Sequence, residues 1–267
     1  MWETPSVQTK GRPIMSLTST NPTDDTELMA MLNPVWFNTY WVENALELYD
    51  GISQHANELT EDNHFFALVQ KFSLDAVVFG ICKLFDCRNE QYEKDTIPRL
   101  VLYLSNHFTD TYVSRLDTSM LIALGVDHTN ASRIVTNFHN HTDVLQTKND
   151  MVEMINKLVP TRTQNPSLEK LFLYRNKVAA HQERLADVVR EQLQYLPSTD
   201  EIEKINRWAS DFCRLMACVL TNVALLPNGI SARMAALNVV AKVLGKNFDQ
   251  SKGGAAYEES DTVFRKP

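Results

Sequence analysis

The stretch HFFALVQKFSLDAVVFGICKLF, residues 64–85, decides the fold. Within it, one set of apolar side chains recurs at offsets of 3, 4, 7, 11 and 14 positions from the first, which is the spacing of a single helical face. The set is Phe65, Leu68, Val69, Phe72, Ala76 and Phe79. We expect this face to pack inward. The opposite side carries Val77, Val78, Ile81 and Leu84, so we expect the helix to be central and covered on more than one face.

Helical patterns continue on both sides of this stretch. Asn33-Pro34 and Asn165-Pro166 each place an N-cap residue before a proline at the first helical position, and Ser198 with Glu201 forms a capping box. Periodicity predicts helices at 35–58, 62–86, 97–107, 130–157, 167–191, 199–226 and 231–245. No stretch alternates as a strand would, and there is no internal repeat. The sequence therefore predicts an all-α protein, a single helical bundle.

The two ends of the chain differ in composition from its centre. Residues 1–26 contain three prolines and nine Ser or Thr, a composition that buries too little apolar surface to offset the entropy of ordering. Residues 247–267 include Gly253-Gly254 and the acidic pair Glu258-Glu259. We expect flexible tails over 1–26 and 247–267, the second of them acidic, and one helical domain over 27–246.

The overall charge limits the function classes. The chain has 267 residues, with 26 Lys or Arg against 33 Asp or Glu and a net charge of −7, which disfavours non-specific coating of nucleic acid and leaves a local basic patch open. Its near-apolar stretches 76–85 and 215–226 are shorter than the roughly 20 residues that span a bilayer, and no secretory segment precedes Met29. We expect a cytoplasmic protein without membrane contact, whose four cysteines stay reduced and mostly buried.

Several catalytic and ligand signatures are absent from the sequence. With only eight glycines, it holds neither a GxGxxG nor a GxxxxGK(S/T) phosphate loop, and it has no GxSxG or HExxH motif. Glu61 and His64 match half of a bundle di-iron site, but no second copy follows. His139 and His141 are two positions apart, so a regular helix points them about 200° apart and they cannot share one ion. We expect no metal and no cofactor.

One segment, LFLYRNKVAAH at residues 171–181, combines side chains that suit RNA cleavage. Arg175 is a permanently charged fork for phosphate oxygens, Asn176 adds a neutral donor and acceptor, and His181 can transfer protons near neutral pH. A metal-free ribonuclease needs a base for the ribose 2′-OH and a cation for the charge that develops at phosphorus. Residues 157–190 also carry seven Lys or Arg and only three acids, so the rest of the chain has a charge of −11. Such a basic island is typical of a surface that holds an RNA backbone.

A structural interpretation of the same segment stays open. An apolar stripe at helical spacing includes His181, which favours a satisfied core histidine. The stripe is Leu171, Tyr174, Val178, His181, Leu185 and Val188. Arg175 and His181 also lie about 9 Å apart along a helix and 120° apart around it, so one helix does not bring them together. A two-fold dimer would line one shared cleft with both pairs.

The pattern Arg175-Asn176-x-x-x-x-His181 resembles the signature of HEPN ribonucleases: an arginine, a polar residue, and a histidine after four to six positions. The stretch DAVVFGICKLFD, residues 75–86, resembles the central helix of the AbiU-type abortive-infection branch of that family. The two features occur in the expected order about 90 residues apart, and the resemblance covers residues 30–226.

The resemblance implies a HEPN-type helical homodimer whose motif helices face one another across a cleft. It implies a toxin-type effector of antiviral defence that cuts RNA, tRNA included, without metal and leaves a 2′,3′-cyclic phosphate. By the match, Arg175 stabilises phosphate, Asn176 positions it and His181 transfers protons. For backbone contacts we add Lys177 and Arg184 on charge alone, and an antitoxin or regulatory protein is a further expected partner.

Two other classes of function stay open at this point. The first is a non-catalytic HEPN-like module, in which Arg175 and His181 hold a dimer together or bind a nucleotide or RNA. The second is an enzyme acting on small metabolites, which requires a deep pocket that the sequence does not indicate.

Overall fold

The computed structural model describes residues 22–59, 64–86, 95–107, 116–180, 196–220, 239–244, 246–248 and 257–259. These residues form helices and one three-residue strand pair. The labelled helices are α1 (Pro22–Ser53), α2 (His64–Leu84), α3 (Ile97–His107), α4 (Thr118–Ala123), α5 (His128–His139), α6 (Val144–Leu158), α7 (Pro166–Ala180) and α9 (Thr199–Leu220), and residues 239–243 are also helical. The strands β1 (Lys246–Phe248) and β2 (Tyr257–Glu259) pair antiparallel. The predicted all-α class is confirmed, and the strand pair is an addition that the sequence did not indicate.

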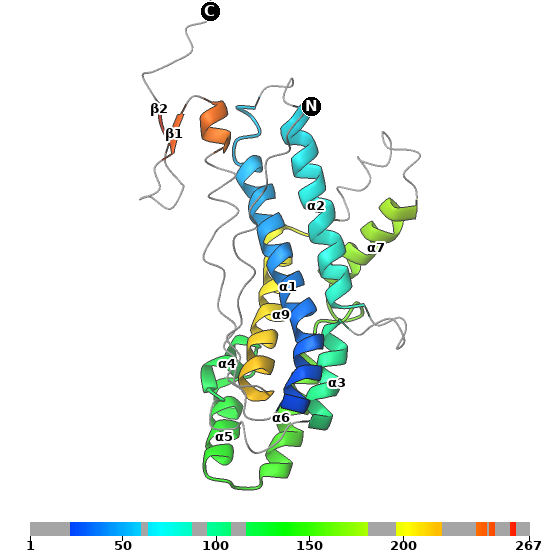
Figure 1. The fold of residues 1–267 in the computed structure, drawn as a ribbon, viewed down its shortest axis with the longest axis vertical. Coiled ribbons are helices and arrows are strands. Elements are labelled where there is room, and N and C mark those ends of the chain that lie inside the picture. Colours follow the sequence, from blue (N-terminus) through cyan, green and yellow to red (C-terminus); the bar gives the residue numbers. More distant parts are fainter. Residues whose placement is uncertain are drawn as a thin grey trace, which may run out of the picture.

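The bundle is elongated (Figure 1). The helices α1, α2 and α9 run along its long axis, α4, α5 and α6 gather at one end, and α7 leaves the bundle beside α2. Side-chain amides tie the long helices together: Asn38 of α1 donates to the Gly80 carbonyl of α2 at 2.7 Å. Asn206 of α9 donates to the Thr39 carbonyl of α1 at 3.0 Å. The position of α1 is therefore set on both sides by buried or half-buried hydrogen bonds.

Two of the three predicted helix starts are confirmed. Helix α7 begins at Pro166, and the Asn165 side chain accepts from the Leu168 amide at 3.0 Å. At the start of α9, Glu201 accepts from the Ser198 amide at 2.9 Å, and the Ser198 hydroxyl accepts from the Glu201 amide at 3.3 Å. Both caps are local interactions, so the sequence contains all that determines them.

The third predicted start is wrong, because Pro34 lies inside α1 rather than at its first position. The helix begins at Pro22, so its first turn occupies the end of the stretch that we expected to be a flexible tail. A proline inside a helix removes one backbone hydrogen bond. Here Leu32 and Val35, on either side of it, are fully buried, and this packing offsets the loss.

The helix predicted at 130–157 is two helices, α5 and α6, separated by a turn. In that turn His141 has φ 51° and Asp143 has φ 45°, left-handed conformations that interrupt helical hydrogen bonding and that Asp and His tolerate better than most residues. The short helix α4, capped by the Asp117 carboxylate on the Ser119 amide, was not predicted.

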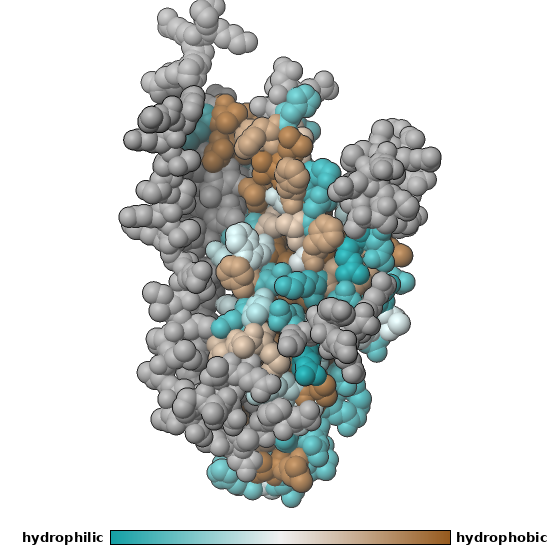
Figure 2. Space-filling view, turned by 45° about the vertical axis from the view of Figure 1, so that its right-hand side comes forward, coloured by the Kyte–Doolittle hydropathy of each residue, from teal (hydrophilic) through white to brown (hydrophobic). Residues whose placement is uncertain are grey.

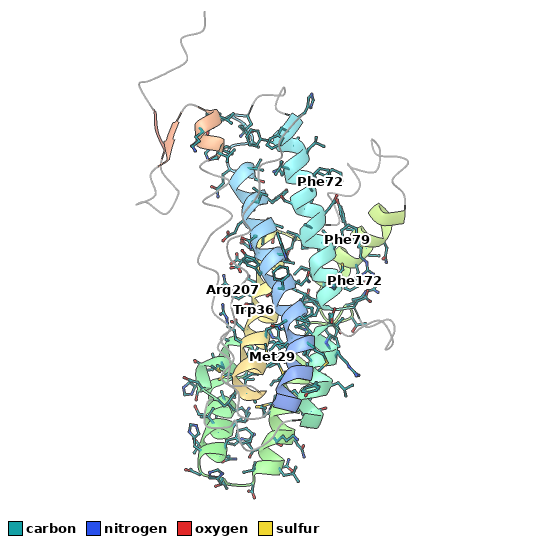
Figure 3. The ribbon with its side chains drawn as sticks, in the orientation of Figure 1. Met29, Trp36, Phe72, Phe79, Phe172 and Arg207 are labelled. Carbon is teal, nitrogen blue, oxygen red and sulfur yellow. The ribbon has the colours of Figure 1, made fainter. Side chains whose placement is uncertain are left out.

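Helix α2 is central, as predicted, but its orientation is the reverse of our expectation. The face with Val77, Val78 and Ile81 is fully buried. On the periodic face, Val69 is half-buried against a small cluster of Ile52, Phe66 and Val240. The rest of that face is open: Phe65 is 65% exposed, Leu68 52%, Phe72 63% and Phe79 44%. Figure 2 shows hydrophobic side chains gathered on this side of the molecule, and in Figure 3 Phe72 projects from α2 away from α1. We call the residues Phe65, Leu68, Phe72, Ala76 and Phe79 the α2 stripe.

By length and composition, α2 is also long and apolar enough to cross a membrane, with a mean hydropathy of 1.7 in its most apolar window. Core helices of soluble proteins meet the same criterion, and 39% of that window is buried inside this protein.

The closest approach between α1 and α2 predicts a stability effect. A Cβ on Gly80 would overlap Val42 Cγ2 of α1, and Val42 is a buried, β-branched side chain. We expect Gly80→Ala to lower the free energy of unfolding by about 1–3 kcal/mol, measured by urea denaturation. In the double variant Gly80→Ala/Val42→Ala the overlap disappears, so its loss should be smaller than the sum of the two single losses. Full additivity would show that the two helices do not touch here.

Candidate functional site

The ion pair between Arg175 and Asp86 is the centre of the candidate site. Arg175 lies on α7, and Asp86 lies two residues beyond the end of α2. Arg175 Nη1 donates to Asp86 Oδ2 at 2.9 Å. The Arg175 side chain is 18% exposed and that of Asp86 28%, so water screens this pair less than a surface pair. The contact therefore fixes the guanidinium of the predicted catalytic arginine beside the end of α2.

Phe172 lies one turn before Arg175 on α7, and the guanidinium groups of two arginines pack against its ring. Its ring centroid lies 4.7 Å from Arg175 Cζ and 4.7 Å from Arg162 Cζ. Figure 3 places Phe172 beside the lower end of α2, where α7 begins to leave the bundle. The ring itself is 1% exposed, so both contacts are cation–π interactions in a largely desolvated setting, where they are strongest.

The site has unused hydrogen-bonding capacity among the residues that the structure describes. Asp86 Oδ1 and Arg162 Nε are buried and have no hydrogen-bond partner in that part of the chain. Buried polar atoms are normally satisfied, so each of these two atoms has capacity for a further partner. Among the described residues, the cluster holds two arginines and one aspartate.

Cys82 lies on α2, one turn before Asp86, and its pKa reflects this environment. The pKa of the Cys82 thiol is raised to about 12, mainly because the thiol is buried; the charge of Asp86 contributes to the rise, and Arg175 and Arg162 oppose it. The thiol is therefore neutral at physiological pH and is unsuited to nucleophilic catalysis. Cys82 and Cys213 are buried and Cys218 is half-buried, so the described cysteines are mostly buried, as predicted; Cys87 lies outside the described residues.

The other predicted site residues are placed only in part. Asn176 is exposed, and its side-chain oxygen accepts from Arg175 Nη2 at a long 3.4 Å. The backbone of Lys177 belongs to α7, but its side chain, together with His181 and Arg184, lies outside the described residues. The structure thus brings Arg175 and Asn176 together and leaves the predicted roles of Lys177, His181 and Arg184 as predictions.

The first half of the apolar stripe on α7 faces the core. Leu171 is fully buried and Tyr174 nearly so. Burial raises the pKa of Tyr174 to about 12, and the negative charge of Asp75 on α2 adds to the rise. Helix α7 therefore packs against α2 along its Tyr174 side, and Arg175, the next residue, reaches the end of α2.

Sequence reasoning missed Asp86, Arg162 and Phe172 as parts of this site. Asp86 was recognised only as the last residue of the central helix, and Arg162 only as one charge in the basic island. The pairing of Asp86 with Arg175 joins positions 89 residues apart, and no local spacing indicates it. One chemical signal was available in the sequence: Asp86 is an acidic residue directly after an apolar helix. Such a residue is a natural ion-pair partner for Arg175, the predicted phosphate-binding arginine.

Apart from this site, a concave region of about 310 Å³ lies between α1 and α9. It is lined by Glu43, Glu47, Asp50, Glu203 and Asp211 together with two arginines, Arg207 and Arg214. Burial raises the pKa of Glu43 and of Asp211, but the groove remains rich in acids and repels a phosphate backbone. Among the described residues, no cluster of His, Cys, Asp and Glu is arranged to hold a metal ion.

No protein-family model, curated protein or solved structure matches the chain. The resemblance to HEPN ribonucleases therefore rests on the residues of the chain itself.

The Arg175–Asp86 pair predicts an asymmetry between two similar substitutions. Asp86→Asn removes the charge that balances a largely buried guanidinium, so we expect the free energy of unfolding to fall by about 1–3 kcal/mol. Asp150→Asn breaks a comparable bond, from Arg133 Nη1 at 3.0 Å, whose arginine is 42% exposed; it should change stability much less. Urea denaturation of both variants measures the difference, and equal effects would show that the Asp86 pair is no better shielded than a surface pair.

The raised pKa of Cys82 predicts slow alkylation. Thiolate is the reactive form, and a pKa of about 12 in place of 9.0 lowers its concentration at pH 8 by about 10³-fold. We expect iodoacetamide to modify Cys82 at least that much more slowly in the folded protein than in urea, as followed by peptide mass spectrometry. Equal rates in the two states would contradict the described environment.

Proposed function

We propose that this protein is a metal-independent endoribonuclease of HEPN type, acting as a toxin-type effector of antiviral defence. The observation that carries the proposal is the anchoring of Arg175: an aspartate just beyond the end of α2 and an aromatic ring hold its guanidinium on α7, the helix that precedes His181 in the sequence. A cation fixed before the substrate arrives is what electrostatic stabilisation of a transition state requires.

The site suggests how the arginine would meet a phosphate. Asp86 accepts from Nη1, and among the described residues the acceptor for Nη2 is exposed Asn176, through a long bond. A phosphate oxygen can replace the Asn176 oxygen as the acceptor of Nη2, and the Asn176 amide group can then donate to a second phosphate oxygen. Arg162, on the same phenylalanine ring, supplies the additional positive charge.

The reaction proposed for this site is an internal displacement. His181 takes the proton from the ribose 2′-OH, the 2′ oxygen forms a bond to phosphorus, and Arg175 stabilises the charge on the non-bridging oxygens. The bond to the 5′ oxygen then breaks, and that oxygen takes up the proton that His181 removed from the 2′-OH, which returns His181 to its neutral form. The products are a 2′,3′-cyclic phosphate and a 5′-hydroxyl end, and the proposed step uses no metal or cofactor.

The proposal includes several partners. RNA, with tRNA as one candidate, is the substrate held by the basic island around α7, through Lys177 and Arg184 among others. A homodimer supplies the shared cleft, and an antitoxin or regulatory protein restrains the activity in the cytoplasm. The proposal involves no membrane.

A non-catalytic module is the second candidate, and one observation favours it. Arg175 already has a carboxylate partner and a buried aromatic neighbour, as a purely structural arginine would. In that case Arg175 and His181 would stabilise the fold or a dimer, or would bind a nucleotide or RNA without cutting it.

Cleavage of total RNA and tRNA in EDTA tests the proposal. We expect the wild type to produce cyclic-phosphate ends and His181→Ala to lose about 10²–10⁴-fold in rate, as expected for removal of a general base. His139→Ala, at an exposed histidine at the end of α5, is the matched control and should cut like the wild type.

Thermal melting of the same proteins separates the two candidates. A catalytic His181 leaves the melting temperature of His181→Ala near that of the wild type. Absence of cleavage by the wild type, together with a His181→Ala protein less stable by about 1–3 kcal/mol, would overturn the enzyme proposal in favour of the structural module.

A further inference from the structure

The α2 stripe is an unusual surface for a helix at the centre of a bundle. Its four large members are each between 44% and 65% exposed. Phe37 and Trp41 of α1 adjoin it, since Asn38, between them on α1, bonds to the Gly80 carbonyl of α2, and both are large exposed side chains. A contiguous apolar patch of this kind on a soluble protein marks an interaction surface.

We propose that this surface binds a second copy of the same chain, with the two α2 helices antiparallel and a two-fold axis passing at Phe72. The spacing carries the argument: counted from Phe72, the stripe lies at −7, −4, 0, +4 and +7, which is the same pattern in both directions. A two-fold axis at Phe72 places a residue n positions before Phe72 opposite the residue n positions after Phe72 in the partner subunit. It therefore places Phe72 on Phe72 of the partner subunit, and every other member of the stripe opposite another member.

The sizes of the paired side chains are complementary. Leu68 lies opposite Ala76 of the partner subunit, so a large side chain meets a small one. Phe65 lies opposite Phe79 of the partner subunit, which gives an aromatic pair at each end.

The flanking charges are arranged for the same pairing. Lys71 and Asp75 lie on one side of the stripe and form an ion pair at 2.7 Å within the chain. A two-fold axis keeps like flanks together, so Lys71 comes to lie about 3 Å along the helix axis from Asp75 of the partner subunit.

The extent of the surface also suits a dimer. The large exposed side chains of the stripe, with Phe37 and Trp41, offer on the order of 600 Å² per copy, taking roughly 100 Å² for each. A stable interface buries about 800 Å² per partner, so the patch accounts for most of the area needed. Its surrounding polar rim supplies the rest.

The pairing would also bring the candidate sites to one side of the dimer. Helix α7 packs on the Asp75 flank of α2, as the effect of Asp75 on Tyr174 shows, and in Figure 1 its C-terminal end is level with the middle of α2. Since like flanks adjoin, both α7 helices lie on the same side. That they form a shared catalytic cleft rests on the proposed function, whereas the pairing itself rests on the stripe alone.

Cysteine cross-linking of the full-length protein tests the register. Under mild oxidation, Phe72→Cys should form a disulfide dimer at least tenfold more than the wild type, whose own cysteines give the background. Phe65→Cys alone should stay at background, because the two copies of that position would be about 21 Å apart, beyond the reach of a disulfide. A mixture of Phe65→Cys with Phe79→Cys should cross-link. Leu145→Cys, at an exposed leucine of α6, is the matched control and should stay at background.

Sedimentation equilibrium gives an independent measurement that needs no oxidation. We expect the wild type to dimerise and Phe72→Lys to weaken the dimer at least 100-fold without lowering the melting temperature of the monomer, since Phe72 is exposed. A monomeric wild type, a dimer that Phe72→Lys leaves intact, or self-cross-linking by Phe65→Cys would each overturn the proposal. So would a monomer that binds neutral phosphatidylcholine vesicles through the stripe.

The two proposals fail in different ways. Loss of the antiparallel dimer with RNA cleavage retained would overturn the pairing and leave the ribonuclease. A dimer with the predicted cross-links but no cleavage would support the pairing and count against the enzyme.

Discussion

The structure depends on the enclosure of α2, a helix with apolar side chains on every side. Val77, Val78 and Ile81 are completely buried, and they are covered because α1 approaches α2 closely at Gly80 while α7 and α9 pack beside it. The three helices α1, α7 and α9 cover α2 on three sides and leave its fourth side uncovered by described residues. The α2 stripe is the part of the helix that the described residues leave open, so the same constraint that builds the core also produces the exposed surface.

This constraint explains which parts of the fold could be predicted. Helix caps such as Asn165-Pro166 and Ser198 with Glu201 are local, so the sequence determines them. Periodicity identified α2 but could not choose its buried face, because both faces are apolar and the choice depends on where Gly80 admits α1. The turn between α5 and α6 was missed because left-handed residues such as His141 and Asp143 leave no clear gap in the apolar pattern.

The candidate site divides in the same way. Arg175 and Asn176 belong to one short motif, and their chemistry was evident without a fold. Asp86, Arg162 and Phe172 became part of the site only through tertiary contacts, since α7 must cross the end of α2 before the carboxylate meets the guanidinium. The sequence alone could not show that Asp86 is the neighbour that orients Arg175 and balances its charge.

The pairing of Asp86 with Arg175 bears on the choice between an enzyme and a structural module. An aspartate that holds an arginine also neutralises it, so Arg175 paired with Asp86 alone would attract a phosphate weakly. Arg162 changes this balance, because its guanidinium packs on the same Phe172 ring as that of Arg175. Among the described residues, the cluster then has one positive charge that no carboxylate balances. A buried structural pair needs no such excess, and its cost in a desolvated site is substantial. Among the described residues, the cluster therefore has one more arginine than acid, and this is the feature that favours the proposed enzyme over a purely structural pair.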